Sequence, residues 1–218
     1  NAANATLDIP ILGTSITEYG VALNLENFNG TVGGNVSGTS DLAPLTEQAQ
    51  MIIDLFPDAK TVGMLYCSSE PNSEYQVKVV TQYLTSKGIT CSDYKFTDSN
   101  DVSLVAEKAA NDCDVIYVPT DNTVASCKET INSVVLPIGT PIFAGEEGIC
   151  EGCGVATLSI SYYQLGYKTG EMAAQILTGE QNISEMPIQY DENPVKKYNK
   201  EIADELGITI PEGYEAIE

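Results

Sequence analysis

The strongest constraint on the fold is an alternation of strands and helices through the middle of the 218-residue chain. Strands are predicted at 61–67, 90–96, 114–120 and 141–146, and helices between them near 74–87, 101–111 and 123–135. Most of these strands are dense in Val, Ile and Tyr without polar alternation, as is typical of parallel strands covered by helices on both faces. The repeated strand–helix–strand order therefore predicts an α/β fold with a doubly wound parallel sheet.

Elements of the same two kinds flank this block. Further strands are predicted at 9–15 and 155–161, and further helices at 41–56, at 163–177 and near 196–206. The sequence contains no internal repeat and no linker long enough to separate independent domains. The alternation thus extends over nearly the whole chain.

The charge balance excludes several classes of partner and of chemistry. Ten basic residues, all of them Lys, stand against 31 acidic residues, which gives a formal net charge of −21. So acidic a surface repels phosphate backbones, and we expect neither nucleic acid nor anionic membranes as partners. The absence of His and Arg removes the usual general base and the bidentate clamp for phosphates. No glycine-rich nucleotide motif follows a predicted strand, so no cofactor is expected.

Polar side chains follow four of the predicted strands, at the ends where open α/β sheets bind ligands. These polar segments are 68–73 after the strand at 61–67, 121–123 after the strand at 114–120, and 16–19 after the strand at 9–15. Glu146 and Glu147 lie at the end of the strand at 141–146. Helix N-terminal N–H groups and hydroxyls can bind a carboxylate, and Asp121, Glu146 or Glu147 can pair with an ammonium group. This set of residues predicts a site for a small zwitterion.

Each of these residues also has a simpler interpretation as a helix cap, because Ser, Asn and Asp are preferred at helix N-termini. Asn72 or Ser73, for example, is placed to cap the helix that follows. Several such residues at one sheet edge favour a binding site over a set of unrelated caps.

Cys150 and Cys153 form a CxxC pattern, which we interpret as a thiol pair or a local disulfide. No second Cys pair and no His accompanies it, so zinc would lack two ligands. A thioredoxin-like role requires the pair at a helix start rather than among glycines. Metal binding and redox chemistry are therefore the less favoured alternatives, and no metal is expected.

Five segments carry a resemblance to a known family: NVSGTSDLAP (35–44), LYCSSEPNS (65–73), IYVPTDNTVAS (116–126), FAGEEG (143–148) and ISYYQLGYKTGEMAAQIL (160–177). In this order they resemble the bacterial ABC-transporter substrate-binding proteins for tryptophan, tyrosine or other amino acids. The resemblance implies a type I periplasmic-binding-protein fold, in which two Rossmann-like lobes close on a ligand.

The resemblance also implies which residues contact the ligand. The first lobe would supply Thr14, Ser15, Thr17 and Glu18, and the second lobe Ser69, Asn72, Ser73, Asp121, Asn122, Thr123, Glu146 and Glu147. Glu18 and Tyr19 stand where the family often has Asp-Pro. The stretch at 150–154 matches no family feature.

Family members begin with additional first-lobe strands and helices, so the resemblance implies that this chain is N-terminally truncated. We expect 1–32 to be a remnant of lobe 1 and the crossover, 33–160 to be a complete lobe 2, and 161–218 to return to lobe 1 and form the tail. An incomplete first lobe would expose a sheet edge and apolar helix faces, which self-association or another chain would cover.

The expected function is that of the extracytoplasmic solute-binding component of an ABC importer, with an amino acid as ligand, an aromatic one favoured, and a membrane permease as partner. The resemblance implies a lipoprotein on a Gram-positive cell surface, or a periplasmic protein. The alternative is a ligand-sensing domain of the same fold in a regulator or receptor. An enzyme is a distant third, since Glu146 and Glu147 could exchange protons but nothing positions a nucleophile.

Overall fold

The computed structural model describes residues 2–217 and divides into two compact units. The larger unit contains Ala43–Ser159 and the chain from Pro194 onward, whereas the smaller unit contains the chain up to Leu42 together with Ile160–Asn193. Contacts therefore group 33–42 with the smaller unit and the C-terminal tail with the larger one. The expected partition at 32/33 and 160/161 into lobes stays a prediction.

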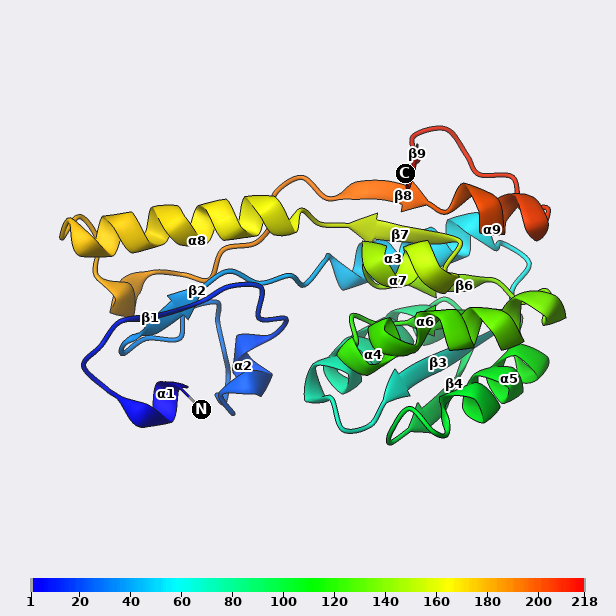
Figure 1. The fold of residues 1–218 in the computed structure, drawn as a ribbon, viewed down its shortest axis with the longest axis horizontal. Coiled ribbons are helices and arrows are strands. Elements are labelled where there is room, and N and C mark those ends of the chain that lie inside the picture. The colour runs from blue at the N-terminus through cyan, green and yellow to red at the C-terminus, as the bar shows by residue number, and fades with distance from the viewer. Residues whose placement is uncertain (1, 218) are drawn as a thin grey trace. The chain divides into compact units, whose positions relative to one another are not determined.

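A seven-stranded sheet forms the centre of the larger unit, in the order β4-β3-β5-β6-β7-β8-β9 (Figure 1). Its strands are β3 (Thr61–Cys67), β4 (Thr90–Phe96), β5 (Val115–Val118), β6 (Ile142–Ala144), β7 (Ala156–Ser159), β8 (Val195–Tyr198) and β9 (Glu215–Ala216). All neighbouring strands pair in parallel except β7 and β8, which are antiparallel. The predicted α/β class with a mostly parallel sheet is confirmed.

Two layers of helices cover this sheet. The helices of the larger unit are α3 (Leu45–Leu55), α4 (Pro71–Ser86), α5 (Val102–Asp112), α6 (Asn122–Val135), α7 (Glu147–Cys153) and α9 (Lys200–Glu205), with a short 3-10 turn, η1 (Leu136–Ile138). Helices α5, α6 and α7 pack beside one another, and α3 packs beside α4 (Figure 1). Leu65 and Cys67 of β3 join the buried cluster under α5, α6 and α7. Such two-sided burial explains why β3 carries apolar residues at successive positions.

Two predicted helix starts are wrong, for reasons of local stereochemistry. Helix α3 begins at Leu45 rather than at 41, and Pro44 is its N-cap. A proline disfavours helical backbone in the residue before it, so the helix cannot extend back to Asp41. Helix α4 begins at Pro71, where the missing N–H costs nothing, and Glu70 rather than Asn72 or Ser73 is its N-cap.

The C-terminal tail and the CxxC segment also differ from expectation. The predicted helix near 196–206 is in part a strand, because β8 pairs with β7 and only Lys200–Glu205 is helical. The CxxC segment, expected among glycines, lies within helix α7.

The smaller unit contains a two-stranded parallel sheet of β1 (Ile11–Gly13) and β2 (Val36–Gly38). Its helices are α1 (Ala2–Ala5), α2 (Tyr19–Ala22) and α8 (Tyr162–Leu177), with the 3-10 turn η2 (Ile183–Glu185). The predicted strand at 9–15 is therefore present as β1, but it pairs with β2 and not with the block at 61–146. Helix α8 lies along β1 and buries Leu165 and Met172.

Gly38 makes the close approach of β1 and β2 possible. Its φ is +147°, and a Cβ atom there would lie 2.0 Å from the carbonyl oxygen of Gly13 and 2.4 Å from the hydroxyl of Tyr19. The space that a side chain would need is thus filled by the backbone of Gly13 and by the hydroxyl of Tyr19. This packing fixes the edge from which the segments after β1 and β2 leave.

Candidate functional site

The loops that follow β3, β5 and β6 leave the same edge of the larger unit's sheet. These three strands are parallel neighbours, so their carboxyl ends coincide. The predicted residues of 68–73, 121–123 and 146–147 are therefore brought to one edge. The fourth predicted loop, after β1, belongs to the smaller unit.

Asp121 connects the ends of β3 and β5 from a buried position. One carboxylate oxygen accepts hydrogen bonds from the backbone N–H of Cys67 at 2.9 Å and from the hydroxyl of Ser73 at 2.8 Å. The other accepts from the N–H of Val124 at 2.8 Å, which caps α6. Only 1% of Asp121 is exposed, and burial raises the pKa of its carboxyl while these hydrogen bonds act to lower it. Both oxygens are thus engaged within the unit.

Glu70, which the sequence-based set omitted, binds the loop after β5. Its carboxylate accepts hydrogen bonds from the backbone N–H of Asn122 and Thr123, at 2.9 and 2.7 Å, and from both of their side chains. Burial acts to raise the pKa of Glu70, but the donors from Thr123 and Asn122 outweigh it and hold the pKa below its ordinary value. The side chains of Asn122 and Thr123 therefore face a carboxylate of their own chain.

The backbone carbonyl of Thr120 accepts hydrogen bonds from side chains of α4 at this edge. It accepts from the side-chain amides of Asn72, at 3.0 Å, and of the buried Gln76, at 3.1 Å. The side chain of Gln76 also accepts from the N–H of Thr120. The hydroxyl of Ser69 is exposed and lies 3.0 Å from the thiol of Cys67. The loop after β5 is therefore held rigidly against α4.

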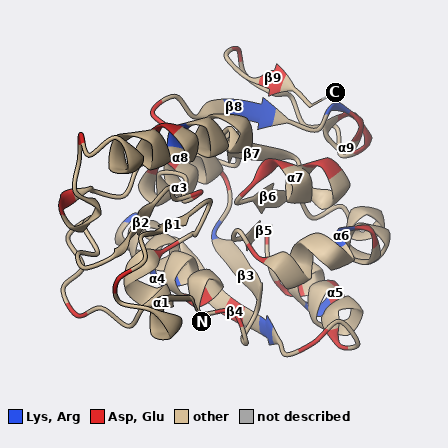
Figure 2. Cartoon of the chain, turned by 60° about the vertical axis from the view of Figure 1, so that its left-hand side comes forward, with Lys and Arg blue, Asp and Glu red and all other residues tan. Residues whose placement is uncertain are grey.

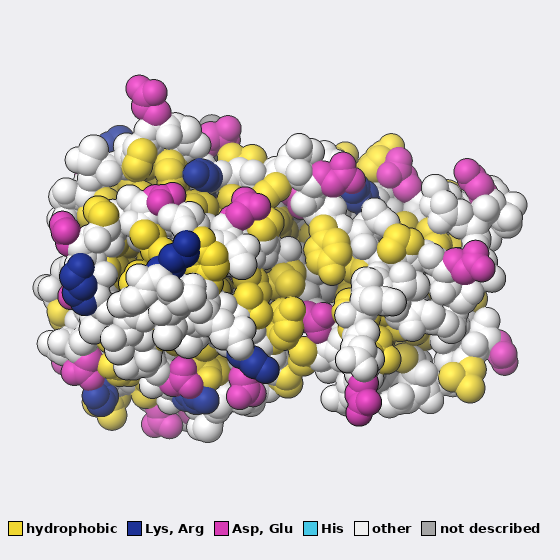
Figure 3. All heavy atoms as spheres, turned by 180° about the vertical axis from the view of Figure 1, so that it is seen from behind, with side chains coloured by type: hydrophobic (Ala, Val, Ile, Leu, Met, Phe, Trp, Pro, Cys, Tyr) yellow, Lys and Arg dark blue, Asp and Glu magenta, His cyan; other side chains and the backbone are white. Residues whose placement is uncertain are grey.

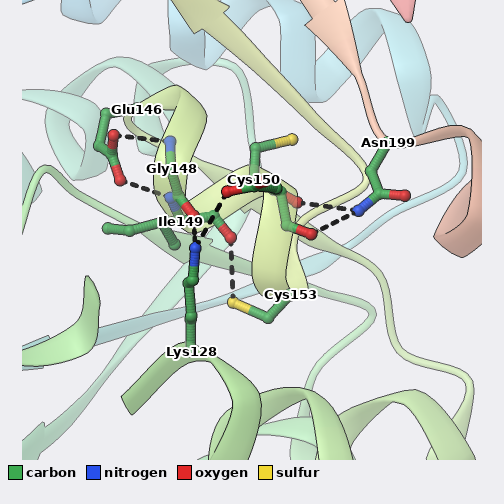
Figure 4. Close-up of polar contacts among 8 residues, drawn as sticks. Lys128, Glu146, Gly148, Ile149, Cys150, Cys153 and Asn199 are labelled. Carbon is green, nitrogen blue, oxygen red and sulfur yellow. Dashed lines mark hydrogen bonds and ion pairs between the residues drawn. The ribbon is translucent and has the colours of Figure 1, made fainter. Parts of the chain in front are cut away.

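Glu146 and Glu147 both have partners close to α7. Glu146 is the N-cap of this helix and accepts from the N–H of Gly148 at 2.7 Å and from that of Ile149 (Figure 4). Glu147 forms an ion pair with Lys197 at 2.8 Å and accepts a hydrogen bond from Ser159. Figure 2 shows the acidic start of α7 in red and the lysines of β8 in blue. Burial acts to raise the pKa of Glu147, but Lys197 and Ser159 lower it.

The thiols of Cys150 and Cys153 are free and buried. The thiol of Cys153 points to the carbonyl of Ile149, and Asn199 donates a hydrogen bond to the carbonyl of Cys150 (Figure 4). Burial raises the pKa of Cys153 to about 12 and that of Cys150 well above its ordinary value. A thiol so placed stays protonated and is a poor nucleophile and a poor metal ligand. Among residues 2–217, no group of three or more His, Cys, Asp or Glu is arranged to hold a metal ion.

The other four predicted residues follow β1 in the smaller unit. Thr14 is exposed, and Ser15 has a φ of +56°, which non-glycine residues rarely adopt. The N–H of Ser15 donates to the hydroxyl of Thr39, and the carbonyl of Thr17 accepts from the hydroxyl of Ser40 at 2.8 Å. Glu18 caps α2 by accepting from the N–H of Val21. The segments after β1 and β2 are thus bonded to each other.

Asp41 lies in the segment after β2 and was absent from the sequence-based set. Its side chain is buried, and one carboxylate oxygen accepts a hydrogen bond from the hydroxyl of Tyr162, at the start of α8, at 3.3 Å. Burial raises the pKa of this carboxyl, and hydrogen bonds from the hydroxyls of Thr17 and Tyr162 lower it by less. The nearby Tyr19 donates its own hydroxyl to the carbonyl of Thr39. The signal for Asp41 was present in the motif at 35–44, but the predicted helix start concealed it.

Acidic side chains are spread over the visible face of both units rather than gathered in one patch (Figure 3). Within the described part of the chain, no helix combines the length and the apolar composition that a membrane span requires. The fold and the polar strand ends are typical of α/β proteins that bind ligands at the carboxyl ends of their strands.

Comparison with known proteins identifies the class. The crystal structure of an ABC domain in complex with L-Trp from Streptococcus pneumonia matches with a TM-score of 0.87 and 35% identity, over 99% of this chain and 76% of that one. A ligand-free, open substrate-binding protein with adhesive properties from Clostridium difficile matches with a TM-score of 0.78 and 36% identity, over 100% and 74%. A LacI-family transcriptional regulator from Bifidobacterium animalis, only 8% identical with a TM-score of 0.54, shares the fold alone. The chain has the type I periplasmic-binding-protein fold.

Comparison of the sequence with family models shows to which family the chain belongs. The family model for ABC transporter substrate binding proteins matches residues 1–216, and the chain belongs to this family. A curated relative, a tyrosine-binding protein of Clostridioides difficile strain R20291, is 35% identical over 190 residues, which are 86% of this chain and 54% of that protein. The chain thus spans about half the length of this relative. Proteins of the family are extracytoplasmic solute-binding proteins, not enzymes.

Proposed function

We propose that the whole protein captures an aromatic L-amino acid and passes it to an ABC importer. The observation that carries this proposal is the pair of relatives at 35% identity, one named as tyrosine-binding and one solved with L-Trp. The absence of Arg and His from the chain is compatible with such a ligand, because N–H groups and hydroxyls suffice for a carboxylate.

Both units contribute ligand contacts in this proposal, as the resemblance implies for two lobes that close together. The predicted contacts divide into two roles. Ser69, Asn122 and Thr123 lie at least partly open to solvent and would touch the ligand, Asn122 and Thr123 while they also donate to Glu70. Asp121 and Ser73 are buried and bonded to each other, so they would act by positioning the loops.

Export and a lipid anchor on the cell surface are part of the same proposal, as is delivery to a membrane permease. A lipoprotein leader in the gene, beside genes for a permease and an ATPase, is the expected finding. A helix-turn-helix segment in the same gene would instead support the sensing alternative, which so far has only the shared fold in its favour.

The experiment that tests this function is a thermal-shift screen of the twenty amino acids on the whole protein. A ligand that binds the native state raises the melting temperature, and at one hundred times its Kd it adds about 2.7 kcal/mol. We expect L-tyrosine, L-tryptophan or L-phenylalanine to give the largest increase, with the D-enantiomers as controls. A flat response to all twenty would overturn the proposal.

A further inference from the structure

Two parallel strands bring the candidate residues of the smaller unit to one edge. Gly13, which ends β1, pairs with Gly38, which ends β2. The segments 14–18 and 39–41 therefore leave the sheet side by side. The start of α8 joins them there, because Tyr162 donates its hydroxyl to Asp41.

The carboxylate of Asp41 is incompletely paired at this place. Only 7% of the residue is exposed, and although the hydroxyls of Thr17 and Tyr162 lower the pKa of its carboxyl, its Oδ1 atom is buried without a hydrogen-bond partner among the described residues. None of the ion pairs found within residues 2–217 includes Asp41. Leaving a buried carboxylate oxygen unpaired is costly, and native proteins rarely do so without a reason.

The other carboxylates near this edge are already engaged. Glu18 accepts from the N–H of Val21 at 2.5 Å and caps α2. Asp191 accepts from the N–H of Ser161 at 2.6 Å and from that of Asn193 at 3.0 Å. Asp41 is thus the carboxylate that retains an unused acceptor in this part of the smaller unit.

The backbone around Asp41 is held in place without using its Oδ1 atom. The hydroxyl of Ser40 donates to the carbonyl of Thr17 and accepts from the N–H of Leu42. The hydroxyl of Thr39 accepts from the N–H of Ser15, whose φ of +56° is itself strained. Strain of this kind and a rigid frame are typical of preorganised binding sites.

We propose that Oδ1 of Asp41 receives the ammonium group of the captured amino acid. An ammonium group supplies both the positive charge and the hydrogen-bond donor that this oxygen lacks. The rings of Tyr162 and Tyr19 are on neighbouring segments, and aromatic faces also favour a cation. The inference rests on the proposed function and adds the residue that would select an amino acid over a plain carboxylic acid.

The test compares two ligands on the whole protein by titration calorimetry: L-tyrosine and 3-(4-hydroxyphenyl)propionate, which lacks the ammonium group. Asp41→Asn keeps the shape of the side chain and removes its charge. We expect this variant to bind L-tyrosine about 10- to 100-fold more weakly, as for the loss of a hydrogen bond to a charged group, and to bind the deamino analogue as the wild type does. Asp8→Asn, an exposed acid of the same unit, is the matched control.

Melting temperatures without ligand separate binding from folding. Removal of a poorly paired buried charge should leave the melting temperature of Asp41→Asn equal to that of the wild type or raise it. A large decrease would assign Asp41 to folding and overturn the inference, as would wild-type affinity of the variant for L-tyrosine. Where L-tyrosine binds poorly to the wild type, L-tryptophan replaces it, with indole-3-propionate as the analogue. If the wild type binds no amino acid at all, the proposed function fails, which is a distinct outcome.

Discussion

The carboxylate of Asp121 accepts a hydrogen bond from the backbone N–H of Cys67 at 2.9 Å and so ties the end of β3 to the start of α6. The same oxygen accepts from Ser73 on α4. One buried side chain therefore fixes the relative positions of two strand ends and two helix starts. Asp121 is thus the N-cap of α6 and also lies at the predicted edge of the sheet, because α6 begins where β5 ends.

Asp121→Ala should destabilise the larger unit. The substitution removes the cap of α6 and leaves the N–H of Cys67 without its acceptor. Loss of a cap together with a buried acceptor predicts a decrease of about 2–4 kcal/mol in the free energy of unfolding. Urea denaturation followed by circular dichroism measures it, with the exposed Asp58→Ala as control. Equal midpoints for the two variants would show that the hydrogen bonds of Asp121 contribute nothing.

Glu70 should make stability depend on pH in the acid range. Its pKa is lowered in the folded state, so the unfolded chain binds more protons and stability falls as the pH falls. This contribution is complete above the unfolded pKa of about 4.3 and is lost as the pH drops through the lower folded value. We expect Glu70→Gln to melt about 3–6 °C below the wild type at pH 7, for a loss of about 1–2 kcal/mol.

The difference between wild type and Glu70→Gln should shrink as the pH falls through the lowered folded pKa of Glu70, because its side chain then becomes uncharged, as that of Gln is. Melting temperatures measured at half-unit steps of pH test this convergence. Glu74→Gln, on an exposed position of the same helix, is the control and should track the wild type throughout. A difference that stays constant with pH would mean that the charge of Glu70 is not what binds the loop.

The two cysteines of the CxxC pattern should react slowly in the native protein. Burial raises the pKa of all four thiols, but Cys150 and Cys153 are almost fully buried, whereas Cys91 and Cys113 are partly exposed to the reagent. Thiolate is the reactive form, so at pH 8 iodoacetamide should label Cys91 and Cys113 first and the CxxC pair only after unfolding in urea. Peptide mass spectrometry reads each site separately. Labelling of Cys150 or Cys153 at the rate of Cys91 would contradict the buried assignment.

The sequence predicted the bounds of β3 and β4, although only β3 is buried along its length and β4 is mostly exposed. Thr61–Cys67 and Thr90–Phe96 match the predicted ranges to the residue. The strand β2 was missed, since Val36-Ser37-Gly38 is three residues long and has one apolar side chain. Its burial comes from packing against Tyr19 and Ile188, which local sequence does not reveal.

The sequence predicted which strand ends share an edge of the sheet, but not the contacts that the side chains make there. The order of the strands places Asp121 and Glu146 at the expected edge of the sheet. No sequence pattern shows, however, that each carboxylate already accepts hydrogen bonds as the N-cap of a helix. Asp41 is the opposite case, because the sequence-based set omitted it although its Oδ1 atom has no hydrogen-bond partner among the described residues. It stands three residues before Pro44, the N-cap of α3, and its partner Tyr162 lies far away along the chain.

Gly38→Ala should destabilise the smaller unit far more than Gly34→Ala. Both glycines have positive φ, at +147° and +58°, so both substitutions carry a backbone cost, of about 1–2 kcal/mol in the left-handed region. At Gly34 a Cβ atom meets nothing within 4 Å, whereas at Gly38 it would lie 2.0 Å from the carbonyl oxygen of Gly13. Backbone cannot move aside as a flexible side chain does, so β1 and β2 would have to separate.

Both variants carry a backbone cost, and it is larger at Gly38, whose φ of +147° lies outside the left-handed region that Gly34 occupies, so the difference in stability reports the contact together with this extra cost. We expect Gly38→Ala to lose at least about 2 kcal/mol more than Gly34→Ala in the free energy of unfolding, the range for forcing an atom into packed space. Hydrogen exchange of the amides of β1 and β2 should accelerate in the first variant alone, which assigns the effect to this sheet. Matching losses in the two variants would mean that the close approach of Gly13 and Gly38 is not a constraint on the fold.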